Sequence, residues 1–192
     1  FTTAVVDNDT VGYVITESGG STSVTEGGSS DSISVVLSSQ PNTKVRITFT
    51  SADTGEVTVS SSALTFDASN WDTPQNLNLL PVTDNEDDDN QTVTITASID
   101  TGFTDDAKYD ALVNQSFSVN VIDVDSAGFT VTESGGSSTV SEAGSTDTFE
   151  VVLNTKPTGN VVFNITEDDV DNSEISLSNS SLTFDNANWS TP

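Results

Sequence analysis

The residues of this chain that could do chemistry are almost all carboxylates. Asp and Glu number 30 against four Lys and Arg, His and Cys are absent, and the formal net charge is −26. The chain therefore lacks the commonest nitrogen ligand of metals and any thiol nucleophile. Clustered oxygen ligands suit a hard cation, Ca²⁺ before Mg²⁺. We expect Ca²⁺ as the cofactor; the alternative is that the acids only solvate loops.

The acids fall mainly at the ends of expected strands and in loops. If successive strands alternate in direction, the segments after the first, third and fifth strands meet the end of the seventh strand at one end of the domain. This count treats residues 56–67 as one kinked strand, and it would split the cluster if they formed two. The candidate ligands are Glu26, Asp31, Asp53, Glu56, Asp84, Glu86, Asp87, Asp88, Asp89, Asp123 and Asp125.

Two known calcium motifs do not match the most acidic segment. DNEDDDNQTVTI, which begins at Asp84, lacks a glycine at its sixth position and has Ile95 at its twelfth, where an EF-hand needs a bidentate glutamate. The glycine-rich nonapeptide of calcium-binding β-rolls is also absent. Any calcium site must therefore be assembled by the fold.

Catalytic constellations are absent from the sequence. Lys44, Lys108 and Lys156 are the only lysines, and none lies beside a recognisable serine elbow. The carboxylate pairs lie in open loops among other acids, whereas an acid-base pair needs one member in an apolar pocket. We expect that the protein is not an enzyme.

A long stretch of the sequence occurs twice. ESGGSTSVTEGGSSDSISVVL at residues 17–37 returns as ESGGSSTVSEAGSTDTFEVVL at 133–153. The period of about 117 residues is long enough for a domain with its own core. We expect the last strand of a preceding repeat at 1–9, a complete repeat at 10–126 and the N-terminal part of the next, truncated, repeat at 127–192.

Alternating apolar residues predict strands. In DSISVVL, for example, Ile33, Val35 and Leu37 would share one face. The expected fold is all-β: tandem immunoglobulin-like Greek-key β-sandwiches with about seven strands per repeat. Trp71 would plug the end of the core or, alternatively, form an exposed platform for sugars. The expected strands are 13–17 with 23–26, 32–38, 44–51, 56–67, 75–83, 91–99 and 116–124.

Four segments resemble the Calx-beta domain and the Calx-beta-like tandem repeats of large bacterial surface proteins and adhesins: VTEGGSSDSISVVLSSQP, LTF, LNLLPVTDNEDDDN and VIDVDSAG. The resemblance covers the whole period, although Asn85 departs from the family pattern in the acidic loop. It implies calcium ligands in the first strand, in the acidic loop and at the end of the last strand. By position these are Glu26, Asp53, Asp84, Glu86, Asp87, Asp88, Asp89, Asp123 and Asp125, with Glu142 and Asp168 or Asp169 in the following repeat.

Charge and repetition together indicate a function. The net charge argues against nucleic acid and anionic membranes as partners, and no apolar run is long enough to span a bilayer. We expect a structural repeat of an extracellular stalk, adhesin or filament at a prokaryotic cell surface, rigidified by Ca²⁺ at the repeat junctions. Its partners would be neighbouring repeats or identical subunits. The alternative is a carbohydrate- or protein-recognition module that acts through the loop at 100–115.

Glycans are a further candidate partner. Ser and Thr make up 58 of the 192 residues, so O-linkage would suit the hydroxyl-rich surface. Asn-X-Ser/Thr sequons mark acceptors for N-linkage, although several arise by chance in such a composition. The sequons are at Asn8, Asn90, Asn114, Asn164, Asn179 and Asn188.

Overall fold

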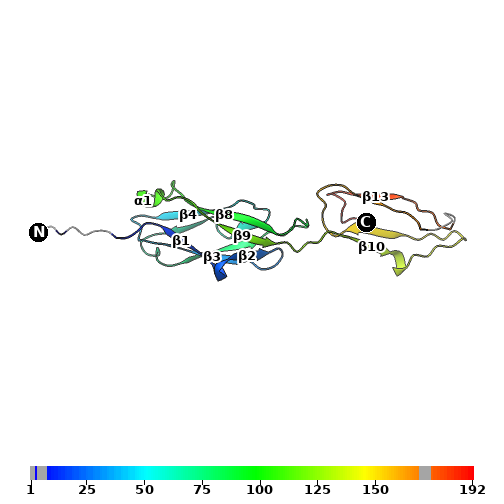
Figure 1. Ribbon diagram of the computed structural model, residues 1–192, viewed down its shortest axis with the longest axis horizontal. Helices are drawn as coiled ribbons and strands as arrows, with labels where there is room; N and C mark the ends of the chain where they lie inside the picture. Colours follow the sequence, from blue (N-terminus) through cyan, green and yellow to red (C-terminus); the bar gives the residue numbers. More distant parts are fainter. Residues whose placement is uncertain (1–2, 4–7, 169–173) are drawn as a thin grey trace. The chain divides into compact units, whose positions relative to one another are not determined.

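A computed structural model describes residues 3, 8–168 and 174–192 of the chain. Nearly all of the regular structure is β-strand, which confirms the predicted all-β fold class (Figure 1). The chain divides into two compact units: Phe1–Asp84 with Asp89–Val124, and Asn85–Asp88 with Asp125–Pro192. No helix among the described residues is long and apolar enough to cross a membrane.

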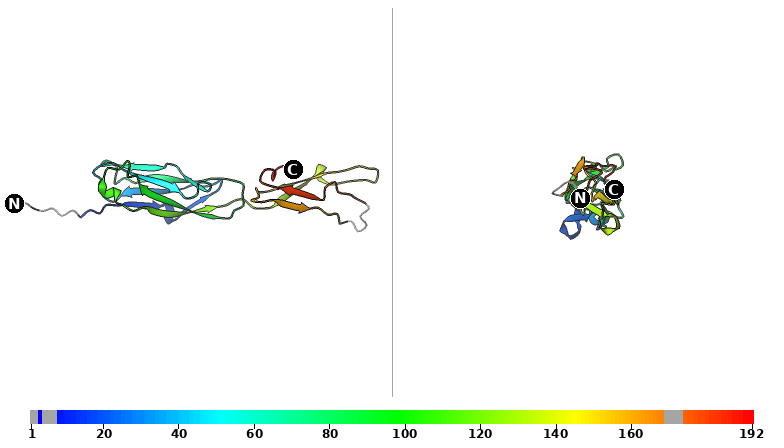
Figure 2. Two further views of the ribbon diagram at one scale, coloured as in Figure 1. Left: turned by 90° about the horizontal axis from the view of Figure 1, so that it is seen from above. Right: turned by 90° about the vertical axis from the view of Figure 1, so that its right-hand side faces the viewer.

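The first unit is a sandwich of two sheets, seen as two layers in Figures 1 and 2. Neighbouring strands are antiparallel, except for one parallel pair, β2 and β9. The four-stranded sheet contains, in spatial order, β1 (Tyr13–Glu17), β3 (Asp31–Leu37), β7 (Gln75–Pro81) and β5 (Val57–Val59). The five-stranded sheet contains β2 (Thr22–Thr25), β9 (Gln115–Ile122), β8 (Gln91–Ile99), β4 (Val45–Ser51) and β6 (Ala63–Phe66).

The first strand is broken at its glycines, as predicted, and its two parts lie in different sheets. β1 lies in the four-stranded sheet, the 3-10 turn η1 (Ser18–Gly20) follows, and β2 lies in the five-stranded sheet. Gly19 and Gly20 have φ angles of 62° and 83°. Only glycine adopts this left-handed region at no steric cost, so these two residues permit the crossing.

The prediction of one strand over residues 56–67 is wrong. The segment forms β5 and β6, which lie in different sheets. Up to Ser60 the backbone bonds β7, since Ser60 N–H donates to Asn78 O (2.9 Å). From Ser62 it bonds β4, since Phe49 N–H donates to Ser62 O (2.9 Å). The serines between β5 and β6 therefore mark a second crossing between sheets.

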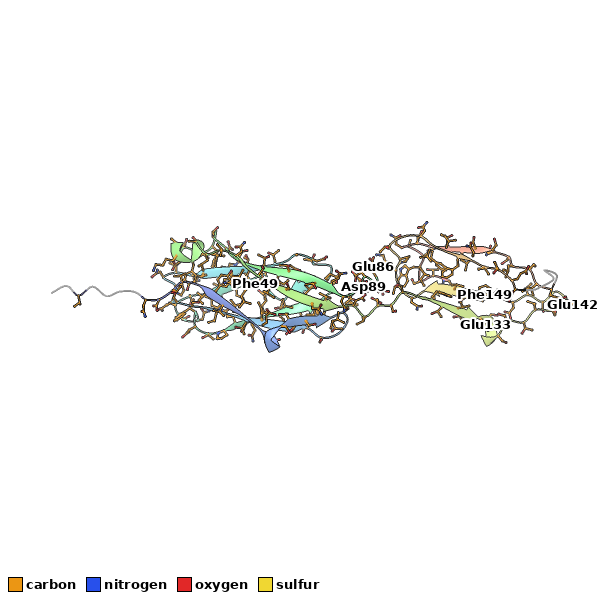
Figure 3. The ribbon with its side chains drawn as sticks, in the orientation of Figure 1. Phe49, Glu86, Asp89, Glu133, Glu142 and Phe149 are labelled. Carbon is orange, nitrogen blue, oxygen red and sulfur yellow. The ribbon has the colours of Figure 1, made fainter. Side chains whose placement is uncertain are left out.

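The core lies between the two sheets and is built from every second residue of the strands. Ile33, Val35 and Leu37 are buried, as the alternation predicts. Phe49 of β4 is buried within the same unit (Figure 3). Trp71 packs against this core, which favours the interpretation as a plug over that of an exposed platform.

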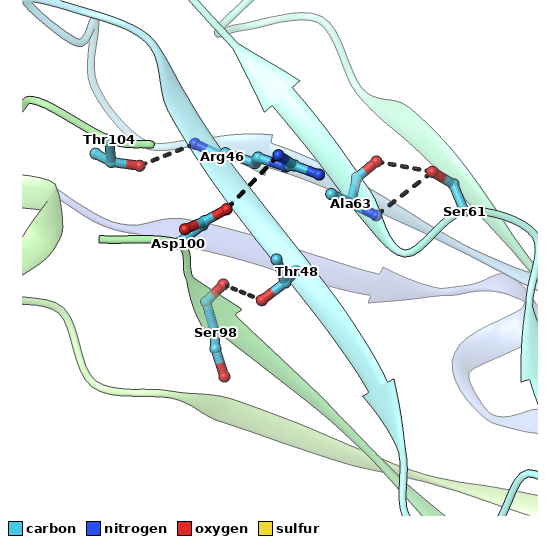
Figure 4. Close-up of polar contacts among 7 residues, drawn as sticks. All are labelled: Arg46, Thr48, Ser61, Ala63, Ser98, Asp100 and Thr104. Atoms are coloured by element: carbon cyan, nitrogen blue, oxygen red, sulfur yellow. Dashed lines mark hydrogen bonds and ion pairs between the residues drawn. The ribbon is translucent and has the colours of Figure 1, made fainter. Parts of the chain in front are cut away.

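The loop at residues 100–115 is folded against the sandwich. It contains the short helix α1 (Ala107–Asp110), whose Tyr109 is buried and donates its hydroxyl to Ser39 O (2.5 Å). Arg46 N–H donates to Thr104 Oγ1 (3.1 Å), and the Arg46 guanidinium lies 3.7 Å from Asp100 Oδ2 (Figure 4). Because β8 runs away from the end at which β7 finishes, this loop closes the opposite end of the sandwich.

The second unit repeats part of this pattern. β10 (Phe129–Glu133) pairs with β11 (Phe149–Leu153), and β12 (Val161–Asn164) pairs with β13 (Ser181–Phe184). The turn η2 (Ser134–Gly136) follows β10 as η1 follows β1. Its buried core consists of Val151, Leu153 and Phe184, with Trp189 packed against it.

We predict that truncation of an inward-facing residue of β7 destabilises the first unit far more than truncation of an outward-facing one. Leu77 is fully buried and Leu80 is 38% exposed. Leu77→Ala should lower the free energy of unfolding by about 2–5 kcal/mol, and Leu80→Ala by under about 1 kcal/mol. Urea unfolding in a Trp189→Phe background, in which Trp71 alone fluoresces, measures both. Equal losses would contradict the assigned strand faces.

Candidate metal centre

The ends of three strands meet at one end of the first unit. Glu26, directly after β2, donates its backbone N–H to Ile122 O, at the end of β9 (3.1 Å). Gly27 donates its N–H to Thr83 Oγ1, just after β7 (2.8 Å). These hydrogen bonds connect segments far apart in the sequence, and they place the loops after β2 and β7 beside the end of β9.

Several acids of this unit lie at that end, and others, such as Asp67 and Asp105, lie at the opposite end. No strand of the five-stranded sheet contains Asp or Glu. Val82 N–H donates to Glu56 O (2.8 Å), which brings the turn after β4 to the end of β7. The candidate ligands that share this end of the first unit are Glu26, Asp31, Asp53, Glu56, Asp84, Asp89 and Asp123.

Glu26 is the buried acid of this group, with only 5% of the residue exposed. The backbone N–H groups of Asp84 and Val124 donate to its carboxylate. Its Oε2 atom is buried and has no hydrogen-bond partner. A buried acceptor left unsatisfied costs about 1–3 kcal/mol, and more if it is charged. At this end of the first unit, the fold therefore presents a buried carboxylate oxygen that lacks a donor.

The surroundings of Glu26 disfavour its negative charge. Burial raises the pKa of the Glu26 carboxyl above its ordinary value, and the charge of Asp84 raises it further. The hydrogen bonds from the Asp84 and Val124 backbone lower this pKa, and the charge of Asp123 raises it again. A bound cation would favour the ionised carboxylate of Glu26, because an opposite charge nearby stabilises the ionised form.

One aspartate of the first unit lies next to Glu26. A carboxylate oxygen of Asp123 lies within 4.8 Å of one of Glu26, whereas Asp125 is the residue at which the second unit resumes. Asp123 and Asp125 are separated by a single residue, directly after β9. The Asp123 backbone N–H donates to Asn90 Oδ1 (3.0 Å), which holds the end of β9 in place.

This arrangement fits a hard cation. The donors are carboxylate oxygens, and no nitrogen or sulfur ligand occurs in a chain without His and Cys. Carboxylates at this separation repel one another unless a positive charge lies between them. The unpartnered Oε2 of Glu26 supplies the position at which a cation would satisfy a buried atom.

Other predicted ligands at this end have local hydrogen-bonding roles. Asp53 Oδ1 accepts from Gly55 N–H (2.8 Å) within the turn after β4. Asp31 accepts from three donors, one of them Ser23 N–H (2.9 Å). Asp89 has a φ of 62°, in the left-handed region that aspartate tolerates better than most residues.

The central residues of the acidic loop belong to the second unit, which contains Asn85–Asp88. There Glu86 forms an ion pair with Lys156 (2.5 Å). Asp87 Oδ2 accepts from the backbone N–H of Ala127 (2.7 Å). Glu86, Asp87 and Asp88 thus lie within a different compact unit from Glu26.

The candidate ligands of the following repeat are exposed. Glu142 lies at one end of the second unit (Figure 3), and Asp168 is exposed as well. Asp169 lies outside the described residues. Glu142 corresponds in the repeat to Glu26, so the same position is buried in the first unit and exposed in the second.

All six sequon asparagines are exposed, but two of them have structural contacts. Asn188 Nδ2 donates to Thr183 O (3.1 Å), so the nitrogen that would carry a glycan is engaged. Asn90 fixes the backbone of Asp123, a role that sequence analysis missed because only its sequon was apparent. Glycosylation at Asn8, Asn90, Asn114, Asn164, Asn179 and Asn188 stays a prediction.

Comparison with known proteins gives structural likenesses only. No family model matches the sequence, and no curated protein matches it significantly. The E. coli chaperone DraB is 8% identical, with a TM-score of 0.42, and the match covers 62% of this chain and 58% of the chaperone. The apo-form Calx CBD1 domain is 14% identical (TM-score 0.40; 59% and 98% covered), and CBD12 from CALX1.2 is 18% identical (TM-score 0.41; 92% and 72% covered). Because these identities and TM-scores are low, the likenesses carry no argument about the site. The description of the site depends on this chain's own residues.

We predict an inverted pH dependence for Glu26 in the presence of a chelator. A folded-state pKa above the ordinary value of 4.5 means that the protonated form is favoured, so stability from this group is present at low pH and is lost as pH rises through the raised pKa. Relative to Glu26→Gln, the wild type should lose about 1.4 kcal/mol of unfolding free energy for each unit of pKa increase. Urea unfolding from pH 4 to 8 checks this; a pH-independent difference would show that Glu26 titrates normally.

Proposed function

We propose that the chain is a structural, non-catalytic repeat segment of an extracellular stalk, adhesin or filament at a prokaryotic cell surface, stiffened by Ca²⁺ at the repeat junctions. The observation that carries the metal is the buried Oε2 of Glu26, which has no hydrogen-bond partner. A hard cation would satisfy this oxygen and lower the repulsion from the neighbouring acids.

Glu26 and Asp123 would hold the ion, and Asp84 would add its charge nearby. Asp125, two residues after Asp123, is the further ligand expected from the linker. Glu26 follows β2, whereas Asp123 follows β9, so a shared ion would fasten two segments that are distant in sequence. Because the carboxylates come together only in the native fold, binding would stabilise that fold by mass action.

The same ion would act on the linker. The segment DVDSAG at residues 123–128 leaves β9 and leads into the next repeat, and it carries both aspartates. With the ion bound, the first residues of the linker are fixed to Glu26. Without it, the carboxylates repel one another and the short linker can bend.

The outer face of the five-stranded sheet supports a stalk rather than a charged binding surface. Thr92, Thr94, Ser116 and Ser118 point outward on β8 and β9 and are exposed. Apart from Arg46, the strands of this sheet carry no charged residue, although the chain has a net charge of −26. A neutral, hydroxyl-rich face with the acids placed at the ends of the unit suits a solvated spacer.

A recognition function for the loop at 100–115 receives less support. Tyr109 and Asp106 of this loop are buried, and Asp106 accepts from the backbone N–H of Asn42 (2.9 Å). The loop thus contributes to the end of the sandwich, and a need to close the fold accounts for its length.

We predict that Ca²⁺ raises the melting temperature through Glu26. At a hundredfold excess over Kd, binding stabilises the native state by about 2.7 kcal/mol, which corresponds to several degrees. Glu26→Gln should abolish the difference between melts in Ca²⁺ and in chelator. Asp105→Asn, which removes one exposed charge from the loop at the opposite end, should retain it. If the wild-type melting curves in Ca²⁺ and in chelator coincide, the acids serve only to solvate the loops.

We predict that Asp123→Asn with Asp125→Asn uncouples the linker from the ion. The double variant keeps side-chain size and removes two charges, so each unit should fold while Ca²⁺ binding weakens. Small-angle scattering in Ca²⁺ should give one well-defined maximum dimension for the wild type and a broad distribution for the variant. Identical profiles and identical calcium responses would refute the action of the ion on the linker.

A further inference from the structure

Asp31 ties three parts of the first unit together. Its Oδ1 accepts from the Ser18 hydroxyl, at the start of η1, and from Ser32 N–H (2.7 Å). Its Oδ2 accepts from Ser23 N–H in β2 (2.9 Å). One carboxylate, at the first residue of β3, therefore joins the end of β1 to the start of β2.

The same set of three hydrogen bonds to one aspartate, which we call the tie, recurs in the second unit. Asp147 accepts from the Ser134 hydroxyl, from Thr139 N–H (2.8 Å) and from Thr148 N–H (2.8 Å). These donors occupy the repeat positions of Ser18, Ser23 and Ser32. Two copies with different neighbouring residues form the same three hydrogen bonds. The tie is therefore a feature of the repeat and not of one copy alone.

The tie does not depend on pairing between sheet strands. In the first unit β2 pairs with β9, for example Val24 with Val121. In the second unit, residues 138–141 form no named strand within the described part of the chain. The tie of Asp147 is nevertheless complete there. The three hydrogen bonds to the carboxylate therefore form without the strand pairing that accompanies them in the first unit.

The tie also shapes the turn that carries Glu26. Ser23 and Asp31 stand at the two ends of this segment, and Glu26 lies three residues after Ser23. Inside it, Gly28 N–H donates to Thr25 O (3.0 Å). The second unit forms the equivalent bond, from Gly144 N–H to Ser141 O (2.9 Å), next to Glu142. Tie and turn thus occur together around each of the two glutamates.

We propose that Asp31 is a positioning residue for the metal ligand Glu26 and is not itself a ligand. This inference rests on the proposed calcium site. Asp31 acts through Ser23, which fixes the start of β2 and hence the place at which Glu26 leaves the strand. Burial alone would raise the pKa of Asp31, but its three hydrogen bonds outweigh burial and hold that pKa below the ordinary value, so the carboxylate is ionised at neutral pH.

The test is Ca²⁺ binding to the 192-residue chain, measured by calorimetry at pH 7 for wild type and Asp31→Asn. Asparagine has a single acceptor oxygen, so it cannot accept at both positions that the two oxygens of Asp31 occupy. Affinity should fall by about tenfold or more, as for other residues that orient metal ligands. Asp67→Asn is the matched control, because Asp67 also accepts from a nearby backbone N–H and hydroxyl, both of Ser69 (2.8 and 2.6 Å), but follows β6 at the opposite end. It should change affinity by less than about twofold.

Ser23→Pro provides a second variant that leaves Asp31 intact. It removes the N–H that Oδ2 accepts and should reproduce the loss of affinity seen for Asp31→Asn. Unchanged affinity in both variants, with binding still abolished by Glu26→Gln, would overturn the positioning role and spare the calcium site. Unchanged binding in Glu26→Gln would overturn both. A loss of one bound ion in Asp31→Asn, with no change in Ser23→Pro, would make Asp31 a direct ligand and contradict the proposal.

Discussion

The constraint on which this fold depends is a buried carboxylate with one oxygen that no protein donor satisfies. Glu26 is held at the meeting point of β2, β7 and β9, where the backbone N–H groups of Asp84 and Val124 reach its carboxylate. Oε2 remains without a partner. A buried acceptor without a donor is costly, and this cost is the basis of the proposed cation.

The rest of the first unit keeps negative charge out of the five-stranded sheet and places it at the two ends of the sandwich. The strands of the five-stranded sheet contain no acid, and the buried faces are apolar. The chain crosses between the two sheets at η1 and again between β5 and β6. At each crossing it keeps its direction, so the strands before and after the crossing run the same way in different sheets. The loops that carry Asp53, Glu56 and Asp84 therefore stay at the same end as Glu26 although strands change sheets.

The sequence predicts the parts of this structure that depend on local pattern. Alternation identified the buried faces of β3, β4 and β8, and the glycines at 19 and 20 marked the break in the first strand, although not the change of sheet there. The second crossing was missed, because serines at 60–62 fit a kinked strand as well as a change of sheet. The partnerless Oε2 of Glu26 and the contact of Asn90 with Asp123 could not be predicted, since they depend on distances between residues far apart in the chain.

The central claim is that Glu26 binds a cation directly, and diffraction from crystals grown in Ca²⁺ tests it most directly. The account predicts an electron-density peak, with the anomalous signal of calcium, at about 2.3–2.6 Å from Glu26 Oε2, with Asp123 also coordinating. A water molecule or a protein donor at Oε2, with calcium absent or bound only among exposed loop acids, would contradict it.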